Sequence, residues 1–290
     1  MENVRLYQVK KDLQQISDML LLNGTLAESP GLVNGKIGIA IFFFHYALFD
    51  NNDIYLDYAM DLIDEMLNQM DINSPTDYAN GLSGIGVGID YLIRNKYLSV
   101  DDDICEEFDD RILCSMSYDH LLNFNQYEGL IGYGRYWITR LRYQTSAVMA
   151  KECLSRIIIL IGERWSDILI SEQMDVLFFL YDLQSISGFD SSMVLMERCL
   201  KEWNLQLQDM EKCFPRLGNS VVSDIVSSYH RNKYFKRSLK SEIDIVLGQI
   251  PNLDMRKSPT GIGLLNGYAG EGMLRLTVLE QTNISWMDLL

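Results

Sequence analysis

The chain has 290 residues, of which 48% are hydrophobic and 22% are charged, so it is long enough to bury a large core. Its formal net charge of −15 argues against nucleic acid or an anionic membrane surface as a partner. The five cysteines form no C-x-x-C pair, residues 1–15 contain no apolar signal segment, and residues 37–49 are too few to span a membrane. We therefore expect a cytoplasmic protein with reduced thiols.

Two kinds of helical segment alternate along the chain. The first kind has the periodicity of a helix with one apolar face. In chain order these segments are 6–22, 54–70, 104–116, 147–165, 191–210 and 236–250. The second kind is apolar nearly all round, as expected for helices surrounded by protein. These segments are 37–48, 85–93, 133–141, 176–183 and 221–229, and a sixth follows Gly267. The five prolines, at 30, 75, 215, 251 and 259, all fall in the predicted connections.

A glycine phrase, [Asn/Glu]-Gly-x-x-Gly-x-[Gly/Ala], opens four of the apolar segments. Its first glycines are Gly35, Gly81, Gly129 and Gly267, so the steps are 46, 48 and 138 residues. The last step is three times 46, which predicts two more units, without glycines, near 175 and 221. The sequence thus predicts one all-α domain over residues 1–290, an (α/α)6 toroid of six inner and six outer helices. We expect the inner helices to start at a central mouth and to point their N-terminal N–H groups into it.

These serial glycine units resemble the lanthionine synthetase C-like (LanC-like) family, and the resemblance runs from Pro30 to Leu276. It implies a cyclase in which zinc activates a cysteine thiol of a ribosomally made peptide. The thiolate then adds to dehydroalanine or dehydrobutyrine and closes a thioether ring. The family takes zinc with the Cys of a W-C-x-G phrase in the fifth unit and the Cys-His of a C-H-G phrase in the sixth. It often works beside a dehydratase.

The zinc positions implied by this resemblance hold other residues here. Arg216 stands at the fifth-unit cysteine, and Leu265 and Asn266 stand at the sixth-unit Cys-His pair. Cys213 lies three residues before Arg216, at the wrong offset. Since leucine cannot bind zinc and arginine repels it, we expect no metal and no cofactor. The three histidines, His45, His120 and His230, have no His or Cys at i+3 or i+4, and we expect them to be structural.

The favoured function is a metal-free, peptide-binding or accessory protein on the cyclase scaffold, a pseudo-cyclase that holds a precursor peptide for a peptide-modifying enzyme. Residues predicted to line its cavity are Tyr133, Trp137, Arg216, Asn266 and Tyr268, with Tyr78, Tyr127 and Tyr136 near them. Two alternatives stay open: a thioether-forming cyclase with a non-standard metal site, and a six-hairpin glycoside hydrolase with paired carboxylates. Cavity acids for such chemistry are Glu271, Glu128 and Asp224, and further acids near helix starts are Asp77, Asp90 and Asp175. Whether the chain is an enzyme is left open.

Overall fold

The fold is all-α, as the sequence predicts. The computed structural model describes residues 2–99, 103–117, 123–143, 145–202, 220–234, 261–280 and 284–290. These residues form α-helices and short 3₁₀ helices, with one isolated β-bridge between Gly261 and Gly267 and no β-strand among them. None of the described helices is long and apolar enough to cross a membrane.

The predicted alternation of two helix types is confirmed. The helices buried nearly all round are α2 (Lys36–Asp50), α4 (Leu82–Arg94), α6 (Leu130–Arg140), α8 (Ile170–Leu183), α11 (Val221–Tyr234) and α13 (Tyr268–Glu280). The helices with one buried face are α1 (Glu2–Asn23), α3 (Asp53–Gln69), α5 (Glu106–Met116), α7 (Ala147–Arg164) and α9 (Ser191–Glu202). The predicted helix over 236–250, the stretch 203–210, and Pro215, Pro251 and Pro259 lie outside the described residues.

One helix start differs from the prediction. The 46-residue step places the fourth unit near 175, but α8 already begins at Ile170. A single 3₁₀ turn, Trp165–Asp167, joins α7 to α8, so no glycine loop separates the two helices. By contrast, α11 begins at Val221, where the step predicts it.

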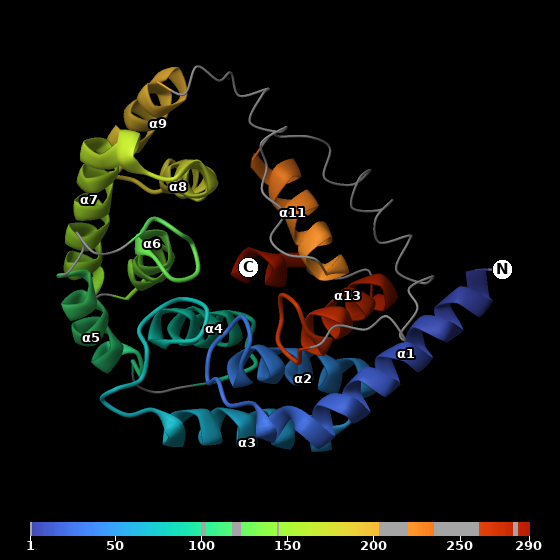
Figure 1. Ribbon diagram of the computed structural model, residues 1–290. Coiled ribbons are helices and arrows are strands. Elements are labelled where there is room, and N and C mark those ends of the chain that lie inside the picture. The colour runs from blue at the N-terminus through green and yellow to red at the C-terminus, as the bar shows by residue number, and fades with distance from the viewer. Residues whose placement is uncertain are drawn as a thin grey trace. The chain divides into compact units, whose positions relative to one another are not determined.

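The chain divides into two compact units, one made of Met1–Ser74 with Arg216–Leu290 and the other of Pro75–Pro215. In the first unit the last repeat packs on the first, since α13 contacts both α1 and α2 (Figure 1). The carbonyl of Val33 accepts hydrogen bonds from the amides of Leu264 at 2.8 Å and Leu265 at 3.4 Å. The sixth repeat is therefore joined to the first, as a repeat that closes on itself requires at this point.

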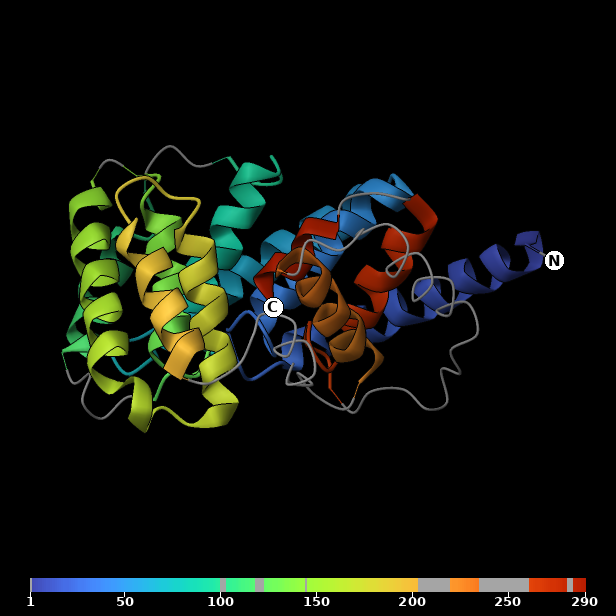
Figure 2. The same cartoon turned by 90° about the horizontal axis from the view of Figure 1, so that it is seen from above.

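In the unit of residues 75–215, α4, α6 and α8 form one row and α5, α7 and α9 a second row beside it (Figures 1 and 2). A buried ion network ties the rows together. The guanidinium of Arg140 on α6 donates to Asp109 on α5 at 2.8 Å and to Asp103 at 2.6 Å. Burial opposes the charge of Arg140, but the hydrogen bonds to both aspartates outweigh it and raise its pKa. Nothing in the sequence pattern indicated this network.

Candidate functional site

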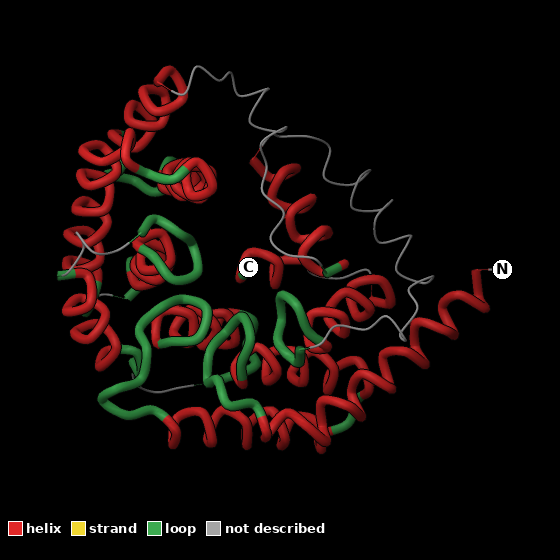
Figure 3. The backbone as a smooth tube through the Cα atoms, in the orientation of Figure 1, coloured by secondary structure: helices red, strands yellow, loops and turns green. Residues whose placement is uncertain are grey.

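Four glycine loops precede the buried helices, and they share one backbone design (Figure 3). They are the first loop (29–35), the second (75–81), the third (123–129) and the sixth (261–267). In each, the first helical amide donates to the carbonyl seven residues earlier. The pairs are Lys36 to Ser29 at 3.0 Å, Leu82 to Pro75 at 3.0 Å, Leu130 to Asn123 at 2.9 Å and Tyr268 to Gly261 at 3.1 Å. These loops therefore cap their own helices. The prediction that the helix N–H groups point into a mouth is wrong for these amides.

The last position of the glycine phrase is a close-packing site. A Cβ atom added to Gly134 on α6 would lie 2.5 Å from the ring of Phe179 on α8. The equivalent glycines meet rings in the same way. The pairs are Gly86 with Tyr136, and Gly272 with Phe42. Each glycine thus admits an aromatic ring from a neighbouring buried helix, so packing alone accounts for this part of the phrase.

Neighbouring loops are joined by main-chain hydrogen bonds. The amides of Tyr78 and Ala79 in the second loop donate to the carbonyl of Tyr127 in the third, at 2.9 and 3.0 Å. In the same way, the amides of Leu264 and Leu265 in the sixth loop donate to the carbonyl of Val33 in the first loop. Val33 and Tyr127 each lie two residues before the last glycine of their loops. The same geometry therefore recurs between loops as well as within each loop.

The third loop has no following glycine loop to bind, and two carboxylates of α8 take its place. Oε2 of Glu172 accepts a hydrogen bond from the amide of Phe124 at 3.0 Å. Oδ2 of Asp175 accepts one from the amide of Gln126 at 3.1 Å. Gln126 occupies the loop position of Tyr78 and Leu264, whose amides donate to backbone carbonyls. The first turns of α8 thus replace a main-chain acceptor with ionisable side chains.

Burial changes the electrostatics of the Asp175 carboxylate on α8. Asp175 is 8% exposed, and this burial raises its pKa to about 7. The hydrogen bond from Gln126 and the charge of Arg135 act the other way, and Glu172 adds to the rise. Arg135 itself lies over the ring of Tyr78, 4.3 Å from its centroid. Asp175 can therefore exchange a proton near neutral pH.

Three aromatic residues of this unit that were predicted to lie in or near the cavity are packed in the protein core. Trp137 is fully buried and donates from Nε1 to Sδ of Met116 at 3.0 Å. Tyr136 is fully buried and donates to Asp109 at 2.6 Å. Tyr133 is 4% exposed, and its hydroxyl lies 3.0 Å from that of Thr76. These three side chains belong to the packed core and do not line an open cavity.

The predicted acids of this unit also have distinct places. Asp77 caps its own loop by accepting from the amide of Asn80 at 2.8 Å, and burial raises its pKa. Asp90 is buried beneath Arg94 at 2.7 Å and Arg142 at 3.0 Å. Only Glu128 is exposed at the loop edge.

In the first unit, Glu271 is part of a buried ion cluster. It is 6% exposed and pairs with Arg275 at 2.5 Å, and Nε of Arg275 lies 3.9 Å from Asp12 on α1. Glu271 is thus a core residue, which removes it as an open acid of a cavity. Asp224 and Asn266 are exposed, and Tyr268 is half-buried.

The residues at the family's zinc positions do not fit a zinc ion. Leu265 is 4% exposed, with a hydrocarbon side chain, and its carbonyl accepts from the hydroxyl of Ser220 at 3.0 Å. Asn266 offers only a neutral amide, and Arg216 lies outside the described residues. Within the described part of the chain, no three His, Cys, Asp or Glu side chains are grouped to hold a metal ion. Zinc chemistry therefore has no ligand set at these positions.

Two of the three histidines lie in described helices. His45 on α2 is half-buried, and burial lowers its pKa to about 4, so it is neutral at physiological pH. His230 on α11 stacks with Tyr234 at 6.0 Å between ring centroids. His120 lies outside the described residues.

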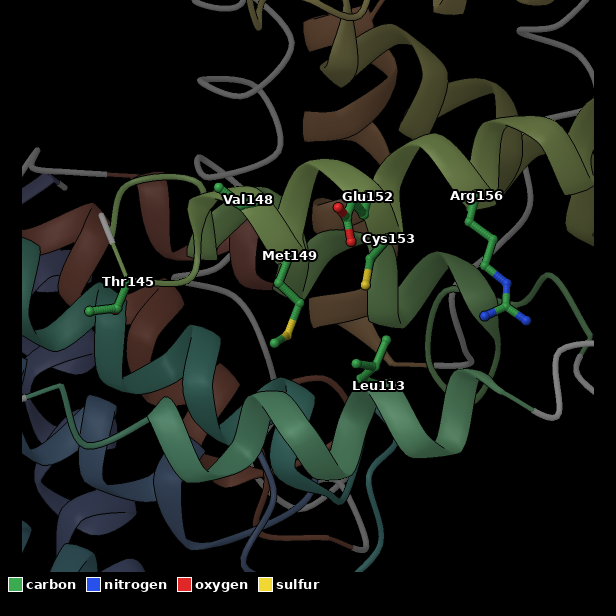
Figure 4. Close-up of a pocket in the computed structure, with 7 residues that line it drawn as sticks. All are labelled: Leu113, Thr145, Val148, Met149, Glu152, Cys153 and Arg156. Atoms are coloured by element: carbon green, nitrogen blue, oxygen red, sulfur yellow. The ribbon is translucent and has the colours of Figure 1, made fainter.

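A separate pocket of about 520 Å³ lies between α5 and α7 (Figure 4). Its lining residues are Leu113, Thr145, Val148, Met149, Glu152, Cys153 and Arg156. The sulfur atoms of Met149 and Cys153 point towards Leu113 across the gap. Burial raises the pKa of Cys153 to about 11, so its thiol stays protonated and is a poor nucleophile. None of the sequence-predicted site residues borders this pocket.

Comparison with known proteins agrees with the repeat. The family described as lanthionine synthetase C-like protein matches residues 27–175, just over half of the chain. This range spans the first three glycine loops and ends at Asp175. No curated protein matches the chain. On the family match and the helical repeat together, the chain belongs to the lanthionine synthetase C-like family.

Proposed function

We propose that this chain is a metal-free, peptide-binding member of its family, an accessory or pseudo-cyclase in the maturation of ribosomally made peptides. The observation that supports this most is the pair Leu265 and Asn266 at the positions where the family needs Cys and His. Leu265 is buried in the loop contact with Val33, so it serves the scaffold at the place where the metal would be held.

The chemistry of thiol addition explains why this pair matters. A metal ion strips the proton from a coordinated thiol, whereas a free cysteine has a pKa of about 8.5 and is mostly protonated at pH 7. A chain that holds a peptide without this cation gives little rate enhancement for ring closure. Peptide binding is therefore the function that we propose for this scaffold.

The proposed peptide contacts are exposed or half-buried residues at the loop edges. They are the exposed Asn266 and the half-buried Tyr268 at the sixth loop, with the exposed Glu128 as a separate contact at the third loop of the other unit, and Arg216 is added on its sequence position alone. The net charge of −15 favours a basic or neutral peptide over an acidic one. A peptide-modifying enzyme would be the partner that supplies or uses the held peptide.

The test uses two fluorescent model peptides with the same core, which contains one cysteine and one dehydroalanine. One carries a lysine-rich leader and the other a glutamate-rich leader. We expect the basic peptide to bind more tightly by fluorescence anisotropy, with no effect of a chelator, and we expect thioether formation no faster than in buffer. Chelator-sensitive ring closure would instead establish an active cyclase, and binding of neither peptide would contradict the proposal.

The glycoside hydrolase alternative has less support. Its leading candidate acid, Glu271, is held in an ion pair with Arg275, and Asp90 is paired with two arginines. A general acid must offer its proton to a substrate, and neither carboxylate is available for that.

A further inference from the structure

The joint between the third loop and α8 differs chemically from the loop joints that surround it. Where the second loop meets the third, both partners are backbone groups, which do not titrate near neutral pH. Where the third loop meets α8, the acceptors are the carboxylates of Glu172 and Asp175. Both side chains are 8% exposed, and they lie three residues apart on one helix face.

The charges near Asp175 do not offset its burial. Arg135 of α6 acts on Asp175 through its charge, and the described residues provide no ion pair to the aspartate. Glu172 on the same helix repels the ionised form of Asp175, and this effect is smaller than the attraction to Arg135. On α9, which also packs against α8, Arg198 and Glu202 pair with each other at 3.4 Å. Burial therefore outweighs the attraction of Arg135, and the ionised form of Asp175 is disfavoured.

We propose that Asp175 makes the closure of the third loop proton-linked: the loop stays closed on α8 while the side chain is neutral, and its opening becomes easier when the side chain ionises. In the neutral form the C=O oxygen of the Asp175 side-chain carboxyl group still accepts a hydrogen bond from the amide of Gln126, so the contact between the loop and α8 is kept. In the ionised form the burial of the carboxylate is costly, and opening the loop lets water solvate it. This inference is independent of the proposed function, since it concerns the loop alone.

The direction of the pH effect follows from linkage. The pKa of Asp175 is about 7 in the closed loop and returns towards its ordinary value when the loop opens. Closure is therefore strongest at acidic pH and weakens as the pH rises towards and through 7. The opening equilibrium gains up to one factor of ten per pH unit within this window.

Hydrogen exchange of the backbone amides of Phe124 and Gln126 tests the proposal in the full chain. After correction for intrinsic exchange, we expect their protection to fall about tenfold or more between pH 5.5 and pH 8. The amide of Leu180, inside α8, serves as reference. In Asp175→Asn, which keeps the acceptor oxygen but cannot ionise, protection should stay within about twofold over the same range. Asp167→Asn, at an exposed position of the same unit, should behave as the wild type.

Constant protection in the wild type, or an equal loss in Asp175→Asn, would overturn the proposal. If Asp175→Asn does not fold, the carboxyl carbon of Asp175 is titrated by NMR in the wild type and in Glu172→Gln. We expect a midpoint near neutral pH that falls when the neighbouring charge is removed. A midpoint near the ordinary value for aspartate, or one that Glu172→Gln leaves unchanged, would also overturn it.

Discussion

Two groups of carboxylates in the unit of residues 75–215 differ in their hydrogen-bond partners, because among the described residues the first group has a cation and the second has none. Asp103 and Asp109 share the guanidinium of Arg140, and Asp109 also accepts from Tyr136 and Ser146. Glu172 and Asp175 accept only backbone amides. The first group has a counter-charge and joins three helices. The second has none among its hydrogen-bond partners in the described residues, so its burial is under-compensated, and a titratable joint lies where the repeat has lost its glycine loop.

The first test of this comparison removes the cation from the first group. Arg140→Met leaves the buried Asp109 and the half-buried Asp103 without their counter-charge, so we expect a loss of about 3–5 kcal/mol in the free energy of unfolding. Urea denaturation measures it. The matched control is Arg94→Met, because Arg94 is 47% exposed and Asp90 keeps its second arginine. The control should cost about 1 kcal/mol or less. Equal losses in both variants would contradict the distinction.

The second test addresses packing between neighbouring buried helices. Gly134→Ala places a methyl group 2.5 Å from the Phe179 ring, and we expect a loss of about 1–3 kcal/mol in unfolding free energy. Gly162→Ala on α7 has no neighbour closer than 3.6 Å and should stabilise the unit by about 0.5–1 kcal/mol. A matching response of the two variants would show that the glycine phrase is not a packing device.

The third test changes the under-compensated group. The pKa of Asp175 is raised in the folded chain, so its contribution to stability is present at acidic pH and lost as the pH rises towards and through 7. The gain of Asp175→Asn over the wild type should therefore be larger at pH 8 than at pH 5 by about 2–3 kcal/mol. Urea denaturation at both pH values measures this difference. A variant that is less stable than the wild type at pH 8 would mean that the charged form holds the structure.

The sequence predicted the helices well, because each depends on local periodicity and on glycine and proline at its ends. The start of α8 was missed for the same reason, since that unit has no glycine to mark it. Trp137 was placed in a cavity because a helix apolar on all sides does not reveal which side faces a ligand. The Arg140 network joins residues 31 and 37 positions apart, and local patterns carry no information on such pairs.

The α8 carboxylates show where a signal could have been found. Asp175 was among the predicted acids, but its role as a cap for another repeat depends on a contact with Gln126, 49 residues away. In the sequence, the only sign of this contact was a pair of acids, Glu172 and Asp175, three residues apart in the unit without glycines. A search for what replaces each lost glycine loop would have singled them out.

The most direct test of the account is the zinc content of the full chain, purified without chelator and measured by elemental analysis. With Leu265, Asn266 and Arg216 at the family's ligand positions, we expect well under one zinc per chain, and a clear gain in the triple variant Leu265→Cys, Asn266→His, Arg216→Cys. About one tightly held zinc in the wild-type chain would contradict the central claim that this family member has lost its metal chemistry.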